Sequence, residues 1–323
     1  MHRFVFFGGK GGVGKTTVSC AYGLKCAEAG LETLVVSTDP AHSTADVFDQ
    51  PFDDEPRSVD GIEGLSAMEL DPDEEVERHL QSVREAMSDQ VSPAIVNELD
   101  RQIELAHRTP GAYEAALFDR FIDVMRERDE FDRVVFDTSP TGGTLRLLSL
   151  PEFLGSWVER LVAKREKSID LFEKAAIGER EARRKQAEDP IIARLLERKE
   201  LFEFAGDTLR NDAAFYLVLN PDELSIRETE RAIESLEEYD LSVSGLVLNK
   251  LAPRPDDEET GTGATYLRQR YETERERVAQ IEAGFDEPVV ARIEQRVEEV
   301  TGDLLAEVAA ELDIAVAPDG PHP

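Results

Sequence analysis

The stretch Gly8-Gly9-Lys10-Gly11-Gly12-Val13-Gly14-Lys15-Thr16-Thr17 decides the fold of this chain. An apolar run, Phe4 to Phe7, precedes it and is typical of a short buried strand, whereas a helix-like segment from about Lys15 to Ala29 follows it. A strand, a glycine-rich turn and a helix are the context that a phosphate-binding loop requires. Glycines let the backbone bend tightly, so successive N–H groups point at phosphate oxygens, and the helix N-terminus adds partial positive charge.

We therefore predict a nucleotide site formed by this loop, from Gly9 to Thr17. The predicted nucleotide-binding residues of the loop are Gly9, Lys10, Gly11, Gly12, Val13, Gly14, Lys15, Thr16 and Thr17. Lys15 should reach the β- and γ-phosphates of ATP, and the Thr16 hydroxyl should bind Mg²⁺ directly. The alternative is a glycine-rich turn that binds nothing, which ten consecutive fitting residues disfavour.

Lys10 is the unusual residue of the loop, because an ordinary phosphate loop needs no cation five residues before the phosphate-binding lysine. Here the loop resembles the deviant Walker A loop, in which such a lysine crosses a dimer interface and contacts the nucleotide of the other subunit. The resemblance implies a second catalytic cation on the developing charge of the transferred phosphoryl group. It also links nucleotide state and dimer geometry in one equilibrium. The alternative is a solvent-exposed loop lysine.

Asp39 follows the second apolar run, Leu34 to Thr38, and is itself followed by Pro40. The carboxyl end of a parallel strand is where such sheets place their chemistry. Asp39 could therefore act as a catalytic residue that orients the attacking water, and Asp39 and Pro40 form a first predicted switch loop. An Asp–Pro turn with a capping aspartate explains the same residues.

Asp137 follows a third apolar run, Phe131 to Phe136. A carboxylate at the end of such a strand, combined with a distant phosphate loop, is the Walker B arrangement, in which Asp137 holds Mg²⁺ through water. The residues after it, Thr138, Pro140 and Gly142 among them, form a predicted switch loop. Gly142 and Gly143 permit this loop to change its backbone state with the γ-phosphate. The alternative is a plain strand-to-helix turn.

The rest of the chain continues the α/β alternation. Further strands are expected at Leu65–Leu70, Ala214–Leu219, Val243–Leu248 and Pro288–Ile293, and further helices at Asp222–Glu238, Ala264–Gly284 and Glu294–Leu312. We predict one α/β ATPase domain over 1–323, a P-loop NTPase with a doubly wound, mostly parallel sheet. An α-helical subdomain is inserted from about 72–128 and 151–210, and 314–323 is expected to be a disordered tail.

Two further features bear on binding. Asn249 stands at the end of the run Val243–Leu248, where its side-chain amide could read the adenine edge through its donor and acceptor. Apolar residues at helical spacing in 151–210 could form a groove for a client, although such spacing more often forms the core of a helix pair.

The strongly acidic composition limits the classes of partner that the protein can bind. The net charge is −32, from 69 acidic and 37 basic residues, and the acidic residues are spread over every predicted helix. Such a surface is typical of adaptation to high salt, where screening shortens the reach of self-repulsion. The alternative is an acidic surface that meets basic partners. Either way, nucleic-acid binding is disfavoured.

The cysteines and the hydropathy indicate a compartment. Cys20 and Cys26 fall six residues apart on the helix after the loop, so we expect two buried or half-buried thiols and no metal pair. No apolar run approaches the ~18 residues of a membrane span, so we expect neither a signal peptide nor stable membrane insertion. Together these features predict a cytoplasmic protein.

Four stretches together resemble the ArsA/Get3 family of arsenite-pump ATPases and tail-anchored-protein targeting ATPases. They are Gly8–Thr17, Ser37–His42, Asp137–Gly142 and Asn220–Arg231. The resemblance implies a Mg²⁺-dependent ATPase that works as a nucleotide-switched homodimer. It implies that Lys10 acts in trans, that Asp39 positions the water, that Asp137 belongs to the second switch and that Asn249 contacts adenine.

The chain departs from the family pattern at several points. Gly143 stands where members usually carry His. No cysteine lies in 253–265, where many members bind zinc across the dimer, so no zinc is expected. The metalloid-binding cysteines of the arsenite pump are absent, and the chain has only four methionines, a residue that suits promiscuous binding of hydrophobic helices.

Four functions follow as hypotheses. The leading one is an ATP-driven switch that binds hydrophobic client segments, such as those of tail-anchored proteins, and delivers them to a membrane receptor. The alternatives are the ATPase subunit of arsenite or anion export, a MinD/ParA-like spatial-organisation ATPase, and a nucleotide-binding scaffold that does not hydrolyse. MinD-like proteins end in a basic amphipathic helix, which this sequence lacks.

Overall fold

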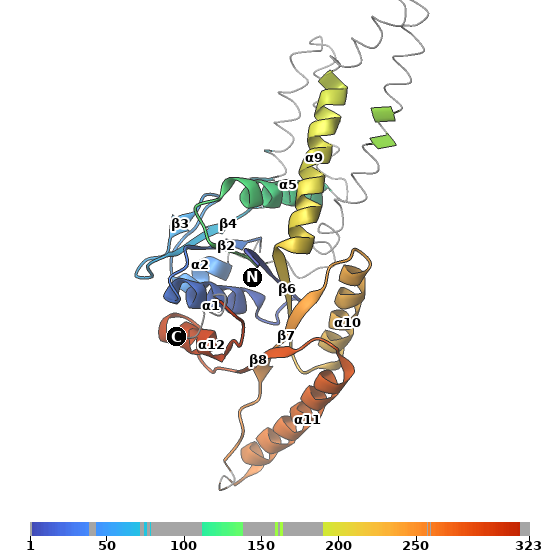
Figure 1. Ribbon diagram of the computed structural model, residues 1–323. Coiled ribbons are helices and arrows are strands. Elements are labelled where there is room, and N and C mark those ends of the chain that lie inside the picture. The colour runs from blue at the N-terminus through green and yellow to red at the C-terminus, as the bar shows by residue number, and fades with distance from the viewer. Residues whose placement is uncertain are drawn as a thin grey trace, which may run out of the picture. The chain divides into compact units, whose positions relative to one another are not determined.

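The computed structural model of the protein describes residues 2–38, 43–71, 74–75, 78, 112–137, 159–160, 162–163, 190–256, 258 and 260–316. The chain divides into two compact units. One unit is Arg146–Asn211, and the other combines Met1–Leu145 with Asp212–Pro323. The second, larger unit contains the sheet (Figure 1).

The sheet of the described residues has eight strands in the order β3-β4-β2-β5-β1-β6-β7-β8. The strands are β1 (Phe4–Gly8), β2 (Thr33–Ser37), β3 (Arg57–Ser58), β4 (Leu65–Glu69), β5 (Arg133–Asp137), β6 (Ala213–Leu219), β7 (Val243–Leu251) and β8 (Val289–Glu294). Neighbouring strands run parallel, and only the two-residue β3 pairs antiparallel with β4. This confirms the predicted α/β class and mostly parallel sheet. The strands β1, β2 and β5 are buried at every position, which explains the consecutive apolar residues of β1 and of the middle of β2 and β5.

One face of the sheet is covered by α1 (Lys15–Glu28), α2 (Ser43–Phe48) and α12 (Gly302–Glu311), as Figure 1 shows. The core of this layer combines alternate strand residues such as Val5, Val35 and Val135 with Val18 of α1 and Val308 of α12. The predicted helix after the loop thus lies against the centre of the sheet. Its position brings the start of α1 to the carboxyl ends of β1 and β5.

The opposite face packs against α5 (Ala112–Glu127), α10 (Glu223–Glu237) and α11 (Thr262–Gly284). Phe6 stacks between Phe136 and Phe215, with ring centroids 4.6 and 5.1 Å apart. Phe121 of α5 meets Phe136 edge-on at 5.0 Å. Aromatic pairs of these two geometries are favourable beyond the area that they bury, so they hold α5 firmly on β1 and β5.

The smaller unit is described over α9 (Pro190–Asn211) and the short helical pieces 159–160 and 162–163. Within it, Lys199 forms an ion pair of 2.8 Å with Glu159. This helix falls inside the range 151–210 for which we predicted a helical subdomain. Most of that range and of 72–111 lies outside the described residues, so the extent of the subdomain stays a prediction.

The C-terminal part corrects two expectations. We expected one helix over Glu294–Leu312, but 295–301 is irregular and α12 begins at Gly302 after an extended Thr301 (φ −135°). We also expected disorder from residue 314. Instead Ile314 and Val316 are buried, and the Arg133 guanidinium donates a hydrogen bond of 3.1 Å to the Val316 carbonyl. The short apolar segment after α12 is therefore part of the core. Residues 317–323 lie outside the described residues.

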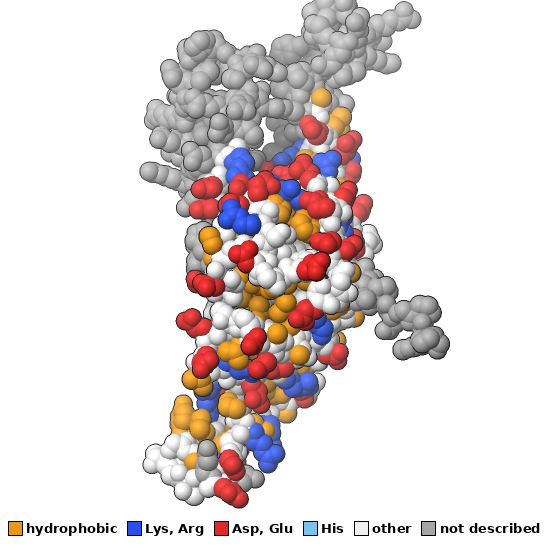
Figure 2. Space-filling view, turned by 90° about the vertical axis from the view of Figure 1, so that its left-hand side faces the viewer, with side chains coloured by type: hydrophobic (Ala, Val, Ile, Leu, Met, Phe, Trp, Pro, Cys, Tyr) orange, Lys and Arg blue, Asp and Glu red, His pale blue; other side chains and the backbone are white. Residues whose placement is uncertain are grey.

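Acidic side chains are scattered over the visible face of the molecule, with basic side chains between them (Figure 2). Among the described residues, several acidic side chains form exposed ion pairs, such as Asp53 with Arg57 at 2.6 Å and Glu223 with Arg227 at 2.5 Å. Exposed pairs of this kind stabilise a fold by at most about 1 kcal/mol each. In the part of the chain that the structure describes, no helix combines the length and the apolar character needed to cross a bilayer.

Candidate functional site

The phosphate-type loop lies between β1 and α1, and two of its glycines are sterically required. Gly9 has φ +139°, and a Cβ there would overlap the backbone oxygen of Val218. Gly14 has φ +94°, and a Cβ there would overlap the side-chain amide of Asn249. L-residues with a side chain rarely adopt such backbone angles. The loop therefore packs against β6 and β7 at distances that only glycine permits.

Lys15 is the first residue of α1, and its side chain is 7% exposed. Its ammonium group donates a hydrogen bond of 3.2 Å to the carbonyl of Lys10, five residues earlier. The side chain thus folds back over the loop. This arrangement puts a buried cation beside a ring of backbone amides, which is the charge distribution that a polyphosphate requires.

Thr16 and Asp137 meet beside the loop. The Thr16 hydroxyl donates a hydrogen bond of 2.7 Å to Oδ2 of Asp137, and the Ser37 hydroxyl lies 3.3 Å from the same oxygen. Asp137 is 1% exposed. A hydroxyl and a buried carboxylate in contact are oxygen ligands of the kind that Mg²⁺ prefers, so these residues fit the predicted ion. Among the described residues no group of three or more His, Cys, Asp or Glu could hold a metal, and Mg²⁺ is usually bound through one or two carboxylates plus substrate phosphates.

Asn249 and Lys250 bind the loop from the end of β7. Asn249 donates from its side-chain amide to the Val13 carbonyl at 2.7 Å and accepts from the Lys250 backbone at 2.8 Å. Lys250 has a left-handed backbone (φ +57°), and its ammonium group donates to the Gly12 carbonyl at 2.6 Å. Two adjacent residues thus fix two adjacent carbonyls of the loop. We refer to this pair, Asn249 and Lys250, as the β7 clasp.

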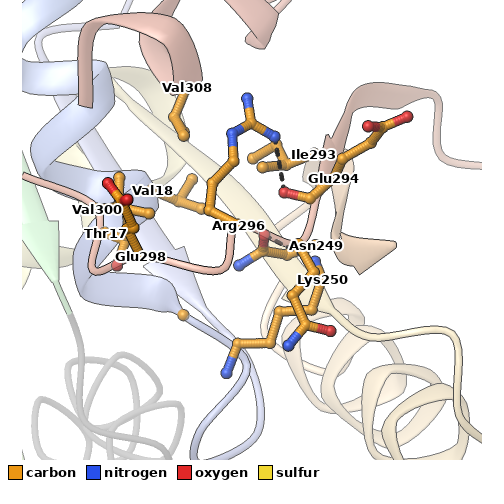
Figure 3. Close-up of a pocket in the computed structure, with 12 residues that line it drawn as sticks. Thr17, Val18, Asn249, Lys250, Ile293, Glu294, Arg296, Glu298, Val300 and Val308 are labelled. Atoms are coloured by element: carbon orange, nitrogen blue, oxygen red, sulfur yellow. Dashed lines mark hydrogen bonds between the residues drawn. The ribbon is translucent and has the colours of Figure 1, made fainter. Parts of the chain in front are cut away.

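A cavity of about 220 Å³ opens beside the β7 clasp. Figure 3 shows the residues around it, with Lys250 extending toward the loop and Arg296 bonded to the Glu294 carbonyl at 2.8 Å. The lining comes from the start of α1, the end of β7, the segment after β8, and α12. The residues are Gly14, Thr17, Val18, Asn249, Lys250, Ile293, Glu294, Gln295, Arg296, Glu298, Val300 and Val308. The irregular segment 295–301 therefore forms one wall of the cavity.

The structure brings several predicted site residues together and leaves others undescribed. Lys10, Lys15, Thr16, Asp137 and Asn249 all lie at the carboxyl ends of neighbouring strands or in the loop itself. The predicted switch residues Asp39, Pro40, Thr138, Pro140 and Gly142 lie outside the described residues, as does Gly143. Their roles stay predictions.

Sequence reasoning missed four features of the site. Lys250, Ser37 and Arg296 were not identified, and the segment 295–301 was placed inside a helix. Ser37 had a detectable signal, because it is a polar residue inside an apolar run at the same strand end as Asp39. Lys250 and Arg296 had none, because surface lysines and arginines are common and their contacts depend on the tertiary fold.

Cys20 and Cys26 are both buried free thiols, as predicted. Burial is the main cause of a raised pKa at each: it raises the pKa of Cys26 to about 11, and the pKa of Cys20 well above its ordinary value. At Cys20 the charges of Asp137 and Glu69 raise the pKa further. Both thiols therefore stay protonated and unreactive at neutral pH.

Comparison with known proteins gives a consistent result. The profile of a family described as anion-transporting ATPase matches residues 2–313. A protein of Aquifex aeolicus, named as a candidate arsenical pump-driving ATPase 2, is 34% identical over 302 residues, which cover 93% of this chain and 95% of that protein. The ATPase get3 of Aspergillus terreus is 32% identical over 93% of this chain and 87% of its own length. A candidate arsenical pump-driving ATPase of Halobacterium salinarum is 33% identical over 96% of this chain, which spans only 44% of that protein.

Proposed function

The chain belongs to the anion-transporting ATPase family and is an ATPase, and we propose that it works as a nucleotide-switched homodimer that binds and delivers hydrophobic protein segments. The observation that carries the nucleotide-dependent part of the proposal is the contact between Thr16 and Asp137, beside a loop with two positions that only glycine can occupy. This is the geometry that a phosphate loop and a Walker B carboxylate need in order to act on one triphosphate.

We assign the residues of the site the following roles toward ATP. The backbone amides of the loop bind phosphate oxygens, and the buried ammonium group of Lys15 neutralises the β- and γ-phosphates. Thr16 and Asp137 would hold Mg²⁺, which would supply positive charge against the negative charge that develops on the phosphates. Asp39 positions the attacking water in this proposal, and Thr138, Pro140 and Gly142 change conformation after the γ-phosphate leaves.

The base of the nucleotide is proposed to enter the cavity beside the β7 clasp. The cavity adjoins Gly14 and Thr17 at the start of α1, on the side of the loop away from Asp137. Asn249 supplies an amide there, although that amide already donates to Val13. A volume of about 220 Å³ has room for a purine ring, and a partly apolar lining with a few polar groups is typical of a small-molecule site.

Lys10 is the residue on which the proposed homodimer rests. Lys15 already supplies the cation of the loop, and the Lys10 carbonyl accepts the bond from the Lys15 ammonium group. The backbone of Lys10 thus serves its own site, while the resemblance to the deviant loop assigns its side chain to the nucleotide of a second copy. A cation from a partner lowers the barrier to phosphoryl transfer by stabilising charge on the transferred group.

Delivery of a hydrophobic client competes with one other function. The family description and two relatives' names favour export of arsenite or another anion. Capture of arsenite by thiolates needs accessible cysteines, whereas the only two cysteines of this chain are buried in α1 with raised pKa values. The resemblance to get3-type ATPases therefore suits the chain better, and its proposed partners are a hydrophobic segment and a membrane receptor.

The test is ATP-dependent capture of a tail-anchored segment in concentrated KCl, with Asp39→Asn used to hold the ATP state. We expect the segment to co-purify with Asp39→Asn in the presence of ATP and to be released from the unmodified protein as ATP is consumed. If the segment were captured equally with and without ATP, the proposed delivery function would be contradicted. Hydrolysis stimulated by arsenite, with no capture of the segment, would instead support export.

A further inference from the structure

Glu69, the last residue of β4, is a carboxylate buried inside the fold, with 5% of its surface exposed. Its Oε1 accepts hydrogen bonds from the backbone N–H groups of Thr44 at 3.1 Å and Ala45 at 3.0 Å. These two amides belong to the first turn of α2. A buried charge is costly unless hydrogen bonds compensate it, so the two bonds explain how this carboxylate is tolerated.

The contact is unusual for the start of a helix. The first amides of a helix are normally bound by a side chain at the N-cap, immediately next to them in sequence. In α2 the amides of Thr44 and Ala45 are bound by Glu69, which follows them by 25 and 24 positions and lies on β4, between β3 and β2 in the sheet. A local cap would only end the helix, whereas Glu69 fixes the helix to the sheet.

The chain is also held at the end of β2, before the segment 39–42 that leads to α2. The Ser37 carbonyl accepts a bond of 2.9 Å from the backbone of Leu70, the residue after Glu69. The Thr38 backbone donates to the Asp137 carbonyl at 3.2 Å. Residues 39–42 therefore connect two points that are both held by the strand ends, and the four-residue connection contains Asp39.

Glu69 also lies close to the nucleotide side of the core. Its charge and that of Asp137 both act on the buried thiol of Cys20. Asp137 in turn contacts Thr16 and Ser37. The end of β4 is thus part of the same group of strand ends as the phosphate loop.

We propose that Glu69 is a positioning residue for ATP hydrolysis, which holds the first turn of α2 and thereby the segment that carries Asp39. This inference rests on the proposed role of Asp39 in orienting water. It predicts that Glu69 influences the hydrolytic step and has little influence on the affinity for ATP, because the hydrogen bonds described above for the phosphate loop come from Lys15 and the β7 clasp and not from α2.

The experiment compares Glu69→Leu and Glu69→Gln with Asp212→Asn as a matched control. Asp212 also accepts a backbone amide, from Arg3 at 2.8 Å, but it does so at the opposite ends of the strands, before β6 and β1. ATP affinity is measured by calorimetry, and kcat by phosphate release. We expect Glu69→Leu to lower kcat by about 10- to 100-fold with ATP affinity changed less than about threefold. Glu69→Gln keeps an acceptor oxygen, so its kcat should lie close to that of the unmodified protein. The kcat of Asp212→Asn should equal that of the unmodified protein.

A second measurement separates positioning from general destabilisation. Glu69→Leu is combined with Asp39→Asn, and the residual rate is followed with radiolabelled ATP. If Glu69 acts through Asp39, the second change should lower the residual rate by less than about twofold, because residues acting as a unit are not additive. The proposal would be overturned if the loss of kcat in the double variant equalled the product of the losses in the two single variants. It would also be overturned if Glu69→Leu and the unmodified protein had equal kcat. A normal rate in Asp39→Asn alone would instead contradict the proposed role of Asp39.

Discussion

Thr16 and Asp137 are 121 residues apart in the chain, and their side chains are joined by a hydrogen bond of 2.7 Å. The parallel pairing of β1 with β5 creates this contact, since Phe7 at the end of β1 lies level with Asp137. The loop after β1 then turns back over that strand end. The contact links the two motifs to which we assign ATP hydrolysis.

Loss of the Thr16 hydroxyl should affect hydrolysis more than folding. Thr16→Val removes the bond to Asp137 and one proposed Mg²⁺ ligand while keeping the shape of the side chain. We expect kcat to fall at least about 100-fold and the Mg²⁺ concentration for half-maximal activity to rise. Thr16→Ser keeps the hydroxyl and should stay within about tenfold of the unmodified rate. Equal rates in Thr16→Val and Thr16→Ser would refute a role for the hydroxyl.

Gly14 should tolerate no side chain. Gly14→Ala forces a Cβ into the Asn249 amide at a left-handed backbone angle. We expect a loss of about 2–4 kcal/mol in the free energy of unfolding and loss of ATP binding. Gly61→Ala is the matched control, because Gly61 has φ +79° with open space around it. It should cost about 1 kcal/mol and leave ATP binding intact. Urea titration and calorimetry measure the two quantities.

Lys250 should matter for nucleotide binding, although no sequence signal identifies it. Lys250→Met removes the bond to the Gly12 carbonyl, and the loop loses half of the β7 clasp. We expect the Kd for ATP to rise about 3- to 30-fold with kcat at saturation changed less. Lys250→Arg keeps a donor and should lie closer to the unmodified protein. An unchanged Kd in Lys250→Met would show that the loop holds its shape without this bond.

Alkaline pH should destabilise the fold because it removes protons from two buried thiols and a buried tyrosine. Burial raises the pKa of Cys26 from 9.0 to about 11, and it also raises the pKa of Cys20 and of Tyr22. The folded state therefore holds these protons more tightly than the unfolded state. The contribution of Cys26 is complete below pH ~9 and is lost as the pH rises toward 11, by up to about 3 kcal/mol. The contributions of Cys20 and Tyr22 are likewise lost only above the ordinary pKa of each group.

Two measurements check this expectation. The free energy of unfolding should fall between pH 9 and 11, and Cys26→Ala should make that fall shallower. Alkylation of both thiols at pH 8 should be slow until denaturant is added. Fast alkylation of the folded protein would show that the thiols are accessible.

The sequence predicted the sheet and the phosphate loop well, because both depend on local patterns. Completely buried strands produce consecutive apolar residues, as in β1 and in the middle of β5, and the loop needs glycine at fixed positions. The same reasoning assigned Thr16 and Asp137 to one site, and their side chains are in contact in the structure. It could do so because parallel strands bring their carboxyl ends to a common edge.

Contacts that depend on tertiary packing were not predictable from local patterns. Glu69 and Lys250 have ordinary neighbours in sequence, and only the strand order places them beside α2 and the loop. The segment 295–301 was mistaken for helix because its charged residues have good helix propensity. Its role as a cavity wall overrides that preference. Ile314 and Val316 resembled a tail, yet they cover apolar core residues.

The claim that Lys10 acts across a dimer can be tested by mixing two inactive variants. Lys10→Ala and Asp39→Asn carry different tags, and their equimolar mixture is exchanged in ATP and concentrated KCl until mixed dimers are isolated through both tags. In a mixed dimer, the Lys10→Ala chain keeps its Asp39 and receives Lys10 from its partner. The account predicts one working site in each mixed dimer, so the isolated mixed dimers should hydrolyse ATP at about half of the unmodified rate. Isolated mixed dimers that are no more active than either variant alone would contradict it.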